Sequence, residues 1–187
     1  MVEIKQDLED LLNRVNLIFK HSEILTECVK DYNGFSLLNM KIGPFKKGKK
    51  YKLKYFIGVP LIEKNILAIA PEEKCDNIVV QRYAISERDD RKIREINDKY
   101  FLNKLKEFKK FMKKYVKEGK KPKADLDRFN SYMANIIDSR LLKLLRLTRT
   151  ELSVSDERRL TNAEQILFSH ISDLIHIWRD FYLKKRE

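Results

Sequence analysis

The chain has 187 residues, of which 43% are hydrophobic and 36% are charged. This length allows one domain or two small ones, and the hydrophobic content is sufficient for a packed core. The longest apolar runs are too short for a membrane-spanning helix, and no apolar segment follows a basic N-terminus as in a signal peptide. The two cysteines form no CxxC pattern, which indicates a reducing compartment. Together these features predict a soluble cytoplasmic protein with no membrane contact.

A formal net charge of +12 predicts an acidic partner, and nucleic acid is the first candidate. The excess is concentrated between Lys104 and Lys123, where ten lysines accompany only two acidic residues. A solvated helix face in a lysine-rich chain also explains this pattern, and Arg is better suited than Lys to bidentate base or phosphate contacts. The candidates for contact with DNA or with an acidic partner are Lys109, Lys110, Lys113, Lys114 and Lys117.

The first forty residues predict a helix and then a hairpin. From Ile4 to Phe19, apolar residues recur at helical spacing with charged residues between them, which predicts an amphipathic helix. Alternation from Ile24 to Lys30 predicts a strand. The Asp-Tyr-Asn-Gly sequence at residues 31–34 then predicts a tight turn into a second strand over residues 35–41.

Two further strands are predicted after a turn from Gly43 to Gly48. Pro44 has no N–H for a sheet, and Gly tolerates a positive φ, so the second strand must end there. Residues 51–54 and 66–69 predict short strands. Residues 55–64 are ambiguous, because Pro60 would interrupt a helix, and residues 76–83 predict either a further strand or a linker.

The remainder of the chain predicts long helices. Ser86 with Asp89 and Thr161 with Glu164 each resemble a capping box, Gly119 is expected to end one helix, and Pro122 suits the first turn of the next. Three apolar stripes at helical spacing follow: Phe101, Leu105, Phe108, Met112 and Tyr115; then Leu126, Phe129, Met133, Ile136, Ile137, Leu141 and Leu144; then Leu167, His170, Ile171, Leu174, Trp178 and Phe181. The prediction is an α+β chain with a small β-rich module (residues 1–83) followed by an α-helical bundle domain (residues 86–187).

The sequence contains no pattern of catalytic or cofactor-binding residues. His21, His170 and His176 form no HExxH or paired Cys/His spacing, and neither a GxGxxG nor a GxxxxGK[ST] loop occurs. Asp125 and Asp127 lie in the predicted first turn of a helix, where carboxylates complement the helix dipole. We therefore expect neither an enzyme nor a bound cofactor.

Two groups of residues carry a resemblance to a known family. The first is Ile42-Gly43-Pro44-Phe45 with Gly48, followed by the apolar segment that ends in Ile66–Pro71. The second is Pro122-Lys123-Ala124-Asp125 entering a helix, with Asp138, Arg140, Lys143 and Leu144 towards its end. In order and spacing they resemble GINS subunits of the replication fork, of the archaeal type with the β-rich domain first, related to the eukaryotic second and third "partner of Sld five" subunits. The resemblance covers most of residues 22–146.

The resemblance implies a non-catalytic scaffold subunit of the GINS complex that links and stimulates the MCM helicase. It implies a heterotetramer with a sister subunit of swapped domain order, located at the nucleoid of an archaeal cell, with a RecJ/Cdc-like protein and primase as further partners. Apolar residues on several sides of the long helices also need neighbours. The interface candidates are Phe129, Met133, Ile137, Asp138, Arg140, Leu141, Leu144, Leu145, Leu174 and Trp178. As a scaffold subunit the chain is also expected to make a weak DNA contact that is secondary to protein assembly. The alternative is a stand-alone basic nucleic-acid-binding protein.

Overall fold

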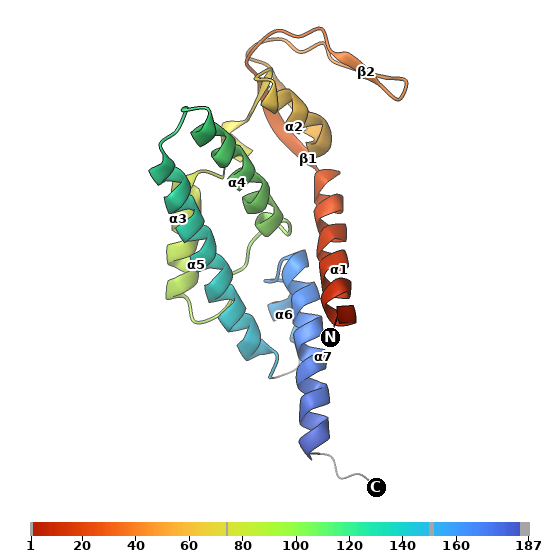
Figure 1. Cartoon of the computed structure of the whole chain (residues 1–187), viewed down its shortest axis with the longest axis vertical. Coiled ribbons are helices and arrows are strands. Elements are labelled where there is room, and N and C mark those ends of the chain that lie inside the picture. Colours follow the sequence, from red (N-terminus) through yellow and green to blue (C-terminus); the bar gives the residue numbers. More distant parts are fainter. Residues whose placement is uncertain (1, 74, 150–151, 184–187) are drawn as a thin grey trace. The chain divides into compact units, whose positions relative to one another are not determined.

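The computed structural model describes residues 2–73, 75–149 and 152–183 (Figure 1). The chain is α+β, as predicted: small antiparallel sheets lie between residues 23 and 69, and helices follow from residue 77. It divides into two compact units. The β-rich unit comprises residues 16–74, and the helical unit comprises residues 75–187 together with residues 1–15.

The β-rich unit is built on a three-stranded antiparallel sheet. Its central strand is β1 (Glu23–Cys28), which pairs with β4 (Lys50–Lys54) on one side and with β5 (Leu67–Ile69) on the other. Every second residue of β1 is buried, which is the period of a strand with one face on a core. These three strands are confirmed close to their predicted positions.

The second predicted strand is a separate hairpin instead. Residues 35–41 do not fold back on β1; β2 (Phe35–Leu37) pairs with β3 (Met40–Ile42). Leu38 and Asn39 both have positive φ, 46° and 64°, which is the backbone of a two-residue hairpin turn. Because this turn reverses the chain, the prediction of one continuous strand here is wrong.

Helix α2 (Tyr55–Glu63) settles the ambiguous segment of the β-rich unit. Pro60 lies inside it and removes one backbone hydrogen bond, that to the carbonyl of Phe56. Burial of Tyr55, Leu61 and Ile62 offsets this cost. The Tyr55 ring packs on Phe19, with ring centroids 4.9 Å apart. A short 3-10 turn, η1 (Pro71–Glu73), follows β5.

The helical unit begins earlier than predicted. Helix α3 (Asn77–Asp89) occupies the segment expected to be a strand or a linker. Its cap is Asp76, whose carboxylate accepts hydrogen bonds from the amides of Ile78 and Val79. Ser86 and Asp89 lie in its last turn and open no helix, and the predicted boundary at residues 83–86 falls inside α3.

The long helices are confirmed. They are α1 (Val2–Lys20), α4 (Phe101–Lys117), α5 (Lys123–Leu147) and α7 (Asn162–Leu183), with the short α6 (Val154–Glu157) before α7. Gly119, with φ 70°, ends α4, and the amide of Lys120 donates back to the carbonyl of Tyr115 over 2.8 Å. One core joins α3, α4 and α5 around Val80, Leu105 and Phe129. A second core joins α5 to α7; its members are Ile93, Leu144 and Leu160, with Leu167, Phe168 and Ile171 packed against them.

Candidate interaction surfaces

A buried ionic cluster lies at the centre of the helical unit, where Arg140 of α5 is only 1% exposed. Its Nε and one Nη bind both oxygens of Glu164 in α7, over 2.5 and 2.8 Å. Its other Nη donates to Glu87 of α3 over 2.9 Å. The carbonyls of Arg94 and Arg159 accept the two remaining N–H groups, over 2.9 and 3.0 Å. All five donors of the guanidinium are therefore satisfied inside one chain.

The two glutamates of this cluster have further partners. Glu87 also accepts from the ammonium of Lys143, 2.6 Å away, and Glu164 accepts from the amide and the hydroxyl of Thr161, over 2.8 and 2.9 Å. The predicted pairing of Thr161 with Glu164 at the start of α7 is thus confirmed. Burial lowers the pKa of Arg140, but hydrogen bonds and charge from Glu164 and Glu87 raise it more, so the pKa lies above its ordinary value.

For three residues the predicted place in an interface is wrong, because their side chains are buried inside this chain. Arg140 belongs to the ionic cluster, Phe129 is 0% exposed and Leu144 is 1% exposed. Phe129 and Leu144 belong to the predicted apolar stripe, and the neighbouring helices of the same chain cover that stripe. Arg140 binds Glu87 of α3 and Glu164 of α7, which are also in the same chain. Met133 is half-buried and packs against the first core. These residues hold the helices of the unit together.

The opposite side of α5 remains exposed. Ile137, Leu141 and Leu145 are each more than a third exposed, at i, i+4 and i+8, and Asp138 beside them is exposed as well. Leu142, at 60%, extends the same surface and was not among the candidates. The sequence signal for it was present, because the last turns of α5 carry leucines on more than one side.

The C-terminal half of α7 is the most exposed apolar surface among the described residues of the helical unit. Leu174 is 47% exposed, and the α7 tip, defined as Ile177, Trp178, Phe181 and Tyr182, is 65–68% exposed. In Figure 1 these turns extend past the end of α5. Trp178 and Phe181 both contact the ring of Tyr182, with centroids 5.2 and 5.0 Å apart, so the aromatic rings form one patch. Leu174 and Trp178 were interface candidates. Phe181, which lies on the predicted stripe, and Ile177 and Tyr182, which border it, were not.

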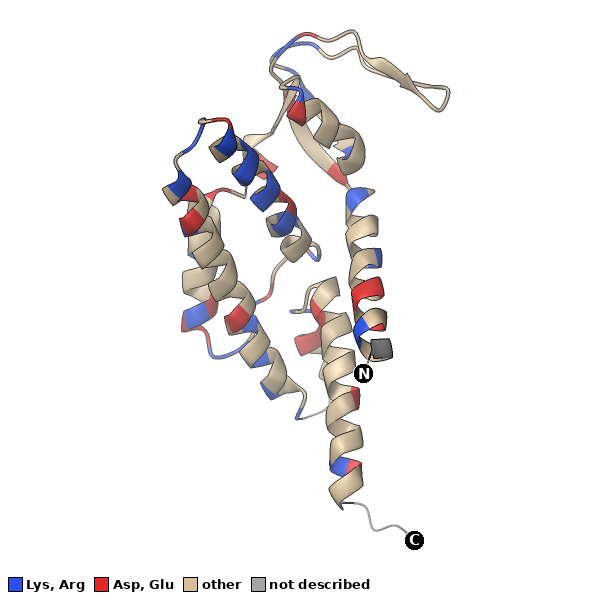
Figure 2. Cartoon of the chain, in the orientation of Figure 1, with Lys and Arg blue, Asp and Glu red and all other residues tan. Residues whose placement is uncertain are grey.

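Helix α4 carries the lysine-rich surface, visible as blue along its ribbon in Figure 2. Some of the charge is neutralised locally: Lys110 pairs with Glu107 over 2.7 Å, and Lys114 lies 3.7 Å from Glu118. Four other lysines make no ion pair with any residue that the structure describes: Lys106, Lys109, Lys113 and Lys117. These four form the free-lysine set.

The aromatic residues of α4 are turned towards the core. Phe111 is 6% exposed, and the Phe108 ring stacks on Phe129 of α5 with centroids 6.1 Å apart. Single-stranded nucleic acids bind chiefly by stacking bases on exposed aromatic rings beside basic groups. The two rings are committed to packing, so α4 offers phosphate contacts without such a stacking platform.

The remaining titratable side chains form no reactive centre within residues 2–73, 75–149 and 152–183. No group of three metal-ligating side chains occurs there. Both cysteines are buried and free, and burial raises the pKa of the Cys75 thiol to about 12. His170 of α7 lies 3.2 Å from Asp7 of α1, which is a helix-to-helix contact. In the same described part of the chain, no helix has both the length and the apolar character needed to cross a membrane.

Comparison of the sequence with models of known protein families, and with curated proteins, finds no match.

Proposed function

We propose that this chain is a non-catalytic scaffold subunit of a GINS-type replication complex. The order and spacing of the motifs around Gly43–Gly48 and Pro122–Leu144 support this proposal, and so does the α+β architecture with the β-rich unit before most of the helical unit. In this role the chain assembles with a sister subunit of swapped domain order into a heterotetramer. The assembly links and stimulates the MCM helicase in an archaeal cell and meets a RecJ/Cdc-like protein and primase.

The exposed α7 tip is the observation that carries the proposal. Soluble monomers rarely expose a contiguous patch of large apolar side chains, and such a patch commonly marks a protein interface. Full burial of one side chain of this size contributes about 1.5–3 kcal/mol. The four tip residues are roughly two-thirds exposed. Covering them would therefore contribute on the order of 5 kcal/mol before the entropy cost of association.

The α5 surface adds to this interface. Ile137, Leu141 and Leu145 lie on one side of the helix, and α5 and α7 contact each other through the second core. Two exposed apolar surfaces on neighbouring helices provide an area for a four-helix contact with another chain. A subunit whose work is assembly needs this kind of surface and needs no catalytic group.

The test is the oligomeric state of the full chain, alone and co-expressed with its sister subunit. A Trp178→Asp/Phe181→Asp variant places two charges in the α7 tip. We expect its affinity for the assembly to fall more than tenfold, as measured by size-exclusion chromatography with light scattering over a range of concentrations. An Arg128→Asp variant makes the same change in net charge at an exposed site of α5 and should assemble normally. A wild-type chain that stays a monodisperse, cooperatively melting monomer even with its sister subunit would contradict the proposal.

The second candidate function is nucleic-acid binding through α4. The free-lysine set favours it, because these four ammonium groups lie on one helix and pair with no acidic group in the described part of the chain. The inward-facing Phe108 and Phe111 weigh against a dedicated single-strand site. We therefore place weak, salt-sensitive DNA contact second to protein assembly.

A further inference from the structure

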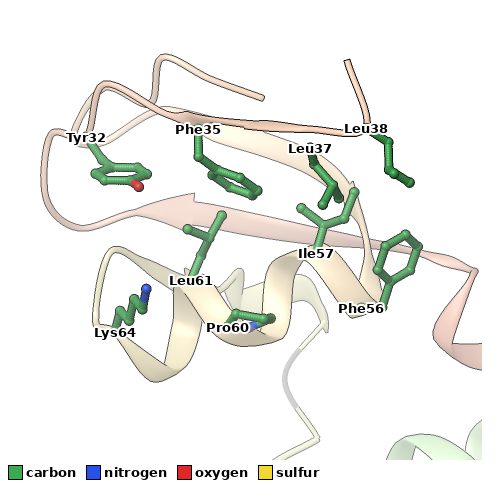
Figure 3. Close-up of a pocket in the computed structure, with 9 residues that line it drawn as sticks. All are labelled: Tyr32, Phe35, Leu37, Leu38, Phe56, Ile57, Pro60, Leu61 and Lys64. Carbon is green, nitrogen blue, oxygen red and sulfur yellow. The ribbon is translucent and has the colours of Figure 1, made fainter. Parts of the chain in front are cut away.

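An apolar groove runs through the β-rich unit between the β2–β3 hairpin and helix α2 (Figure 3). Its volume is about 550 Å³. Phe35 and Leu37 of β2 form one wall, and Ile57 and Leu61 of α2 form the other. Both pairs follow from local geometry, since alternate residues of a strand share a face and residues four apart share a helix face. All the residues that line the groove belong to this one unit.

The apolar surface continues to the mouth of the groove. Leu38, at the hairpin turn, is 86% exposed, and Phe56, in the first turn of α2, is 40% exposed. Figure 3 shows both side chains at the same end, beside Leu37 and Ile57. Turn residues are usually polar, and a leucine this exposed beside other apolar side chains forms the kind of contiguous apolar surface that commonly marks an interaction site.

The opposite end of the groove is polar and positive. Figure 3 shows the ring of Tyr32 on the hairpin side and the side chain of Lys64 on the α2 side at this end. The Lys64 ammonium makes no ion pair, and the Tyr32 hydroxyl makes no hydrogen bond, with any residue that the structure describes. An ammonium and a phenol beside each other suit a carboxylate.

We propose that this groove docks a short acidic segment of a partner protein. Two or three bulky apolar side chains of the segment lie between the hairpin and α2, and one carboxylate binds Lys64 and Tyr32. The volume lies within the range of about 300–1,000 Å³ that is usual for small ligand sites, so it holds a few side chains and no folded domain. The apolar walls disfavour a nucleic-acid backbone, and Lys64 repels a basic segment. The site is separate from the α7 tip and stands independently of the proposed assembly.

The test is a titration of the full chain with three fluorescein-labelled peptides. The first is Asp-Leu-Phe-Asp-Leu-Leu-Glu-amide with the label on its N-terminal amine, the second replaces its acidic residues with Lys, and the third replaces its apolar residues with Ser. We expect saturable binding of the first peptide alone, with a Kd on the order of 10–100 µM. In the wild-type chain its binding should shift the methyl resonances of Leu37, Leu38 and Ile57.

Protein variants locate the site. Lys64→Glu and Leu38→Ser should each weaken binding of the acidic peptide at least tenfold. Lys92→Glu, between α3 and α4, makes the same charge change at an exposed site outside the groove and outside the free-lysine set, and should leave the Kd unchanged. The proposal is overturned if the acidic peptide shows no saturable binding up to about 1 mM, if the Lys peptide binds as tightly, if Lys92→Glu weakens binding as much as Lys64→Glu does, or if decanoate shifts the groove methyls while the peptide does not.

Discussion

Replacement of Arg140 by Met tests whether the ionic cluster organises the helical unit. Met is a flexible apolar side chain of similar length, so it fills much of the volume but donates no hydrogen bond. Arg140 bonds groups that belong to α3, to the segment before α4, to the segment before α7 and to α7 itself. Its removal therefore acts on every element that surrounds this part of α5.

The expected cost follows from what the substitution leaves behind. Glu164 keeps its two bonds from Thr161 but loses a bidentate partner, and Glu87 loses one of the two cations that it binds and keeps Lys143. The carbonyls of Arg94 and Arg159 each lose a donor. Breaking a buried ion pair by removing one partner typically costs about 3–5 kcal/mol. Because domains of this kind are stable by about 5–15 kcal/mol in total, we expect much of the unit's stability to be lost.

The assay is chemical unfolding of the full chain, followed by circular dichroism and by the fluorescence of Trp178. Arg146→Met, at an exposed site of the same helix, is the control and should change the free energy of unfolding by less than about 0.5 kcal/mol. Adding Glu164→Gln to Arg140→Met should recover part of the loss, because it removes one uncompensated buried charge. If Arg140→Met costs no more than the control, the cluster does not organise the unit.

Two further predictions concern His170 and α4. The pKa of His170 is raised above its ordinary 6.5, chiefly by a hydrogen bond with the Ile166 carbonyl and then by the contact with Asp7. The protonated side chain therefore stabilises the fold fully below pH 6.5, and this stabilisation is lost as the pH rises through the higher pKa of the folded state. The difference in melting temperature between wild type and Asp7→Asn should shrink over the same range, and a difference that grows with pH would contradict the assignment. Changing the free-lysine set to Glu should abolish DNA binding if these side chains contact phosphates. In that case the slope of log K against log salt for the wild-type chain should be about −0.9 for each contact. The same change at Lys30, Lys41, Lys46 and Lys49 is the control, and unchanged DNA binding by the α4 variant at low salt would exclude this role.

The sequence alone located most of the regular elements. Helices α1, α4, α5 and α7 follow from apolar residues at helical spacing, and the ends at Gly119 and Thr161 follow from cap chemistry. Strands β1, β4 and β5 follow from alternation and from the residues that stop them. These features depend on residues within a few positions of one another, so a local pattern is enough to find them.

Tertiary packing determined the conformation of the segments for which the local sequence did not decide between a helix and another structure. Residues 77–83 include Ile, Val and Tyr, which favour strands, but the segment is helical because Val80 and Ala84 then enter the core on one side of α3. Helix α2 tolerates Pro60 because Leu61 and Ile62 are buried in the β-rich unit. In both segments, packing against distant residues outweighs propensities worth about 1–3 kcal/mol.

The partners of charged residues were also beyond local inference. Arg140 was an interface candidate, but its partners are Glu164 and Glu87, which lie 24 and 53 residues away in the same chain. The groove beside Lys64 likewise forms only when the hairpin lies over α2. Periodicity shows which face of an element is apolar, but the folded chain alone determines which faces are covered, because burial depends on contacts between segments far apart in sequence.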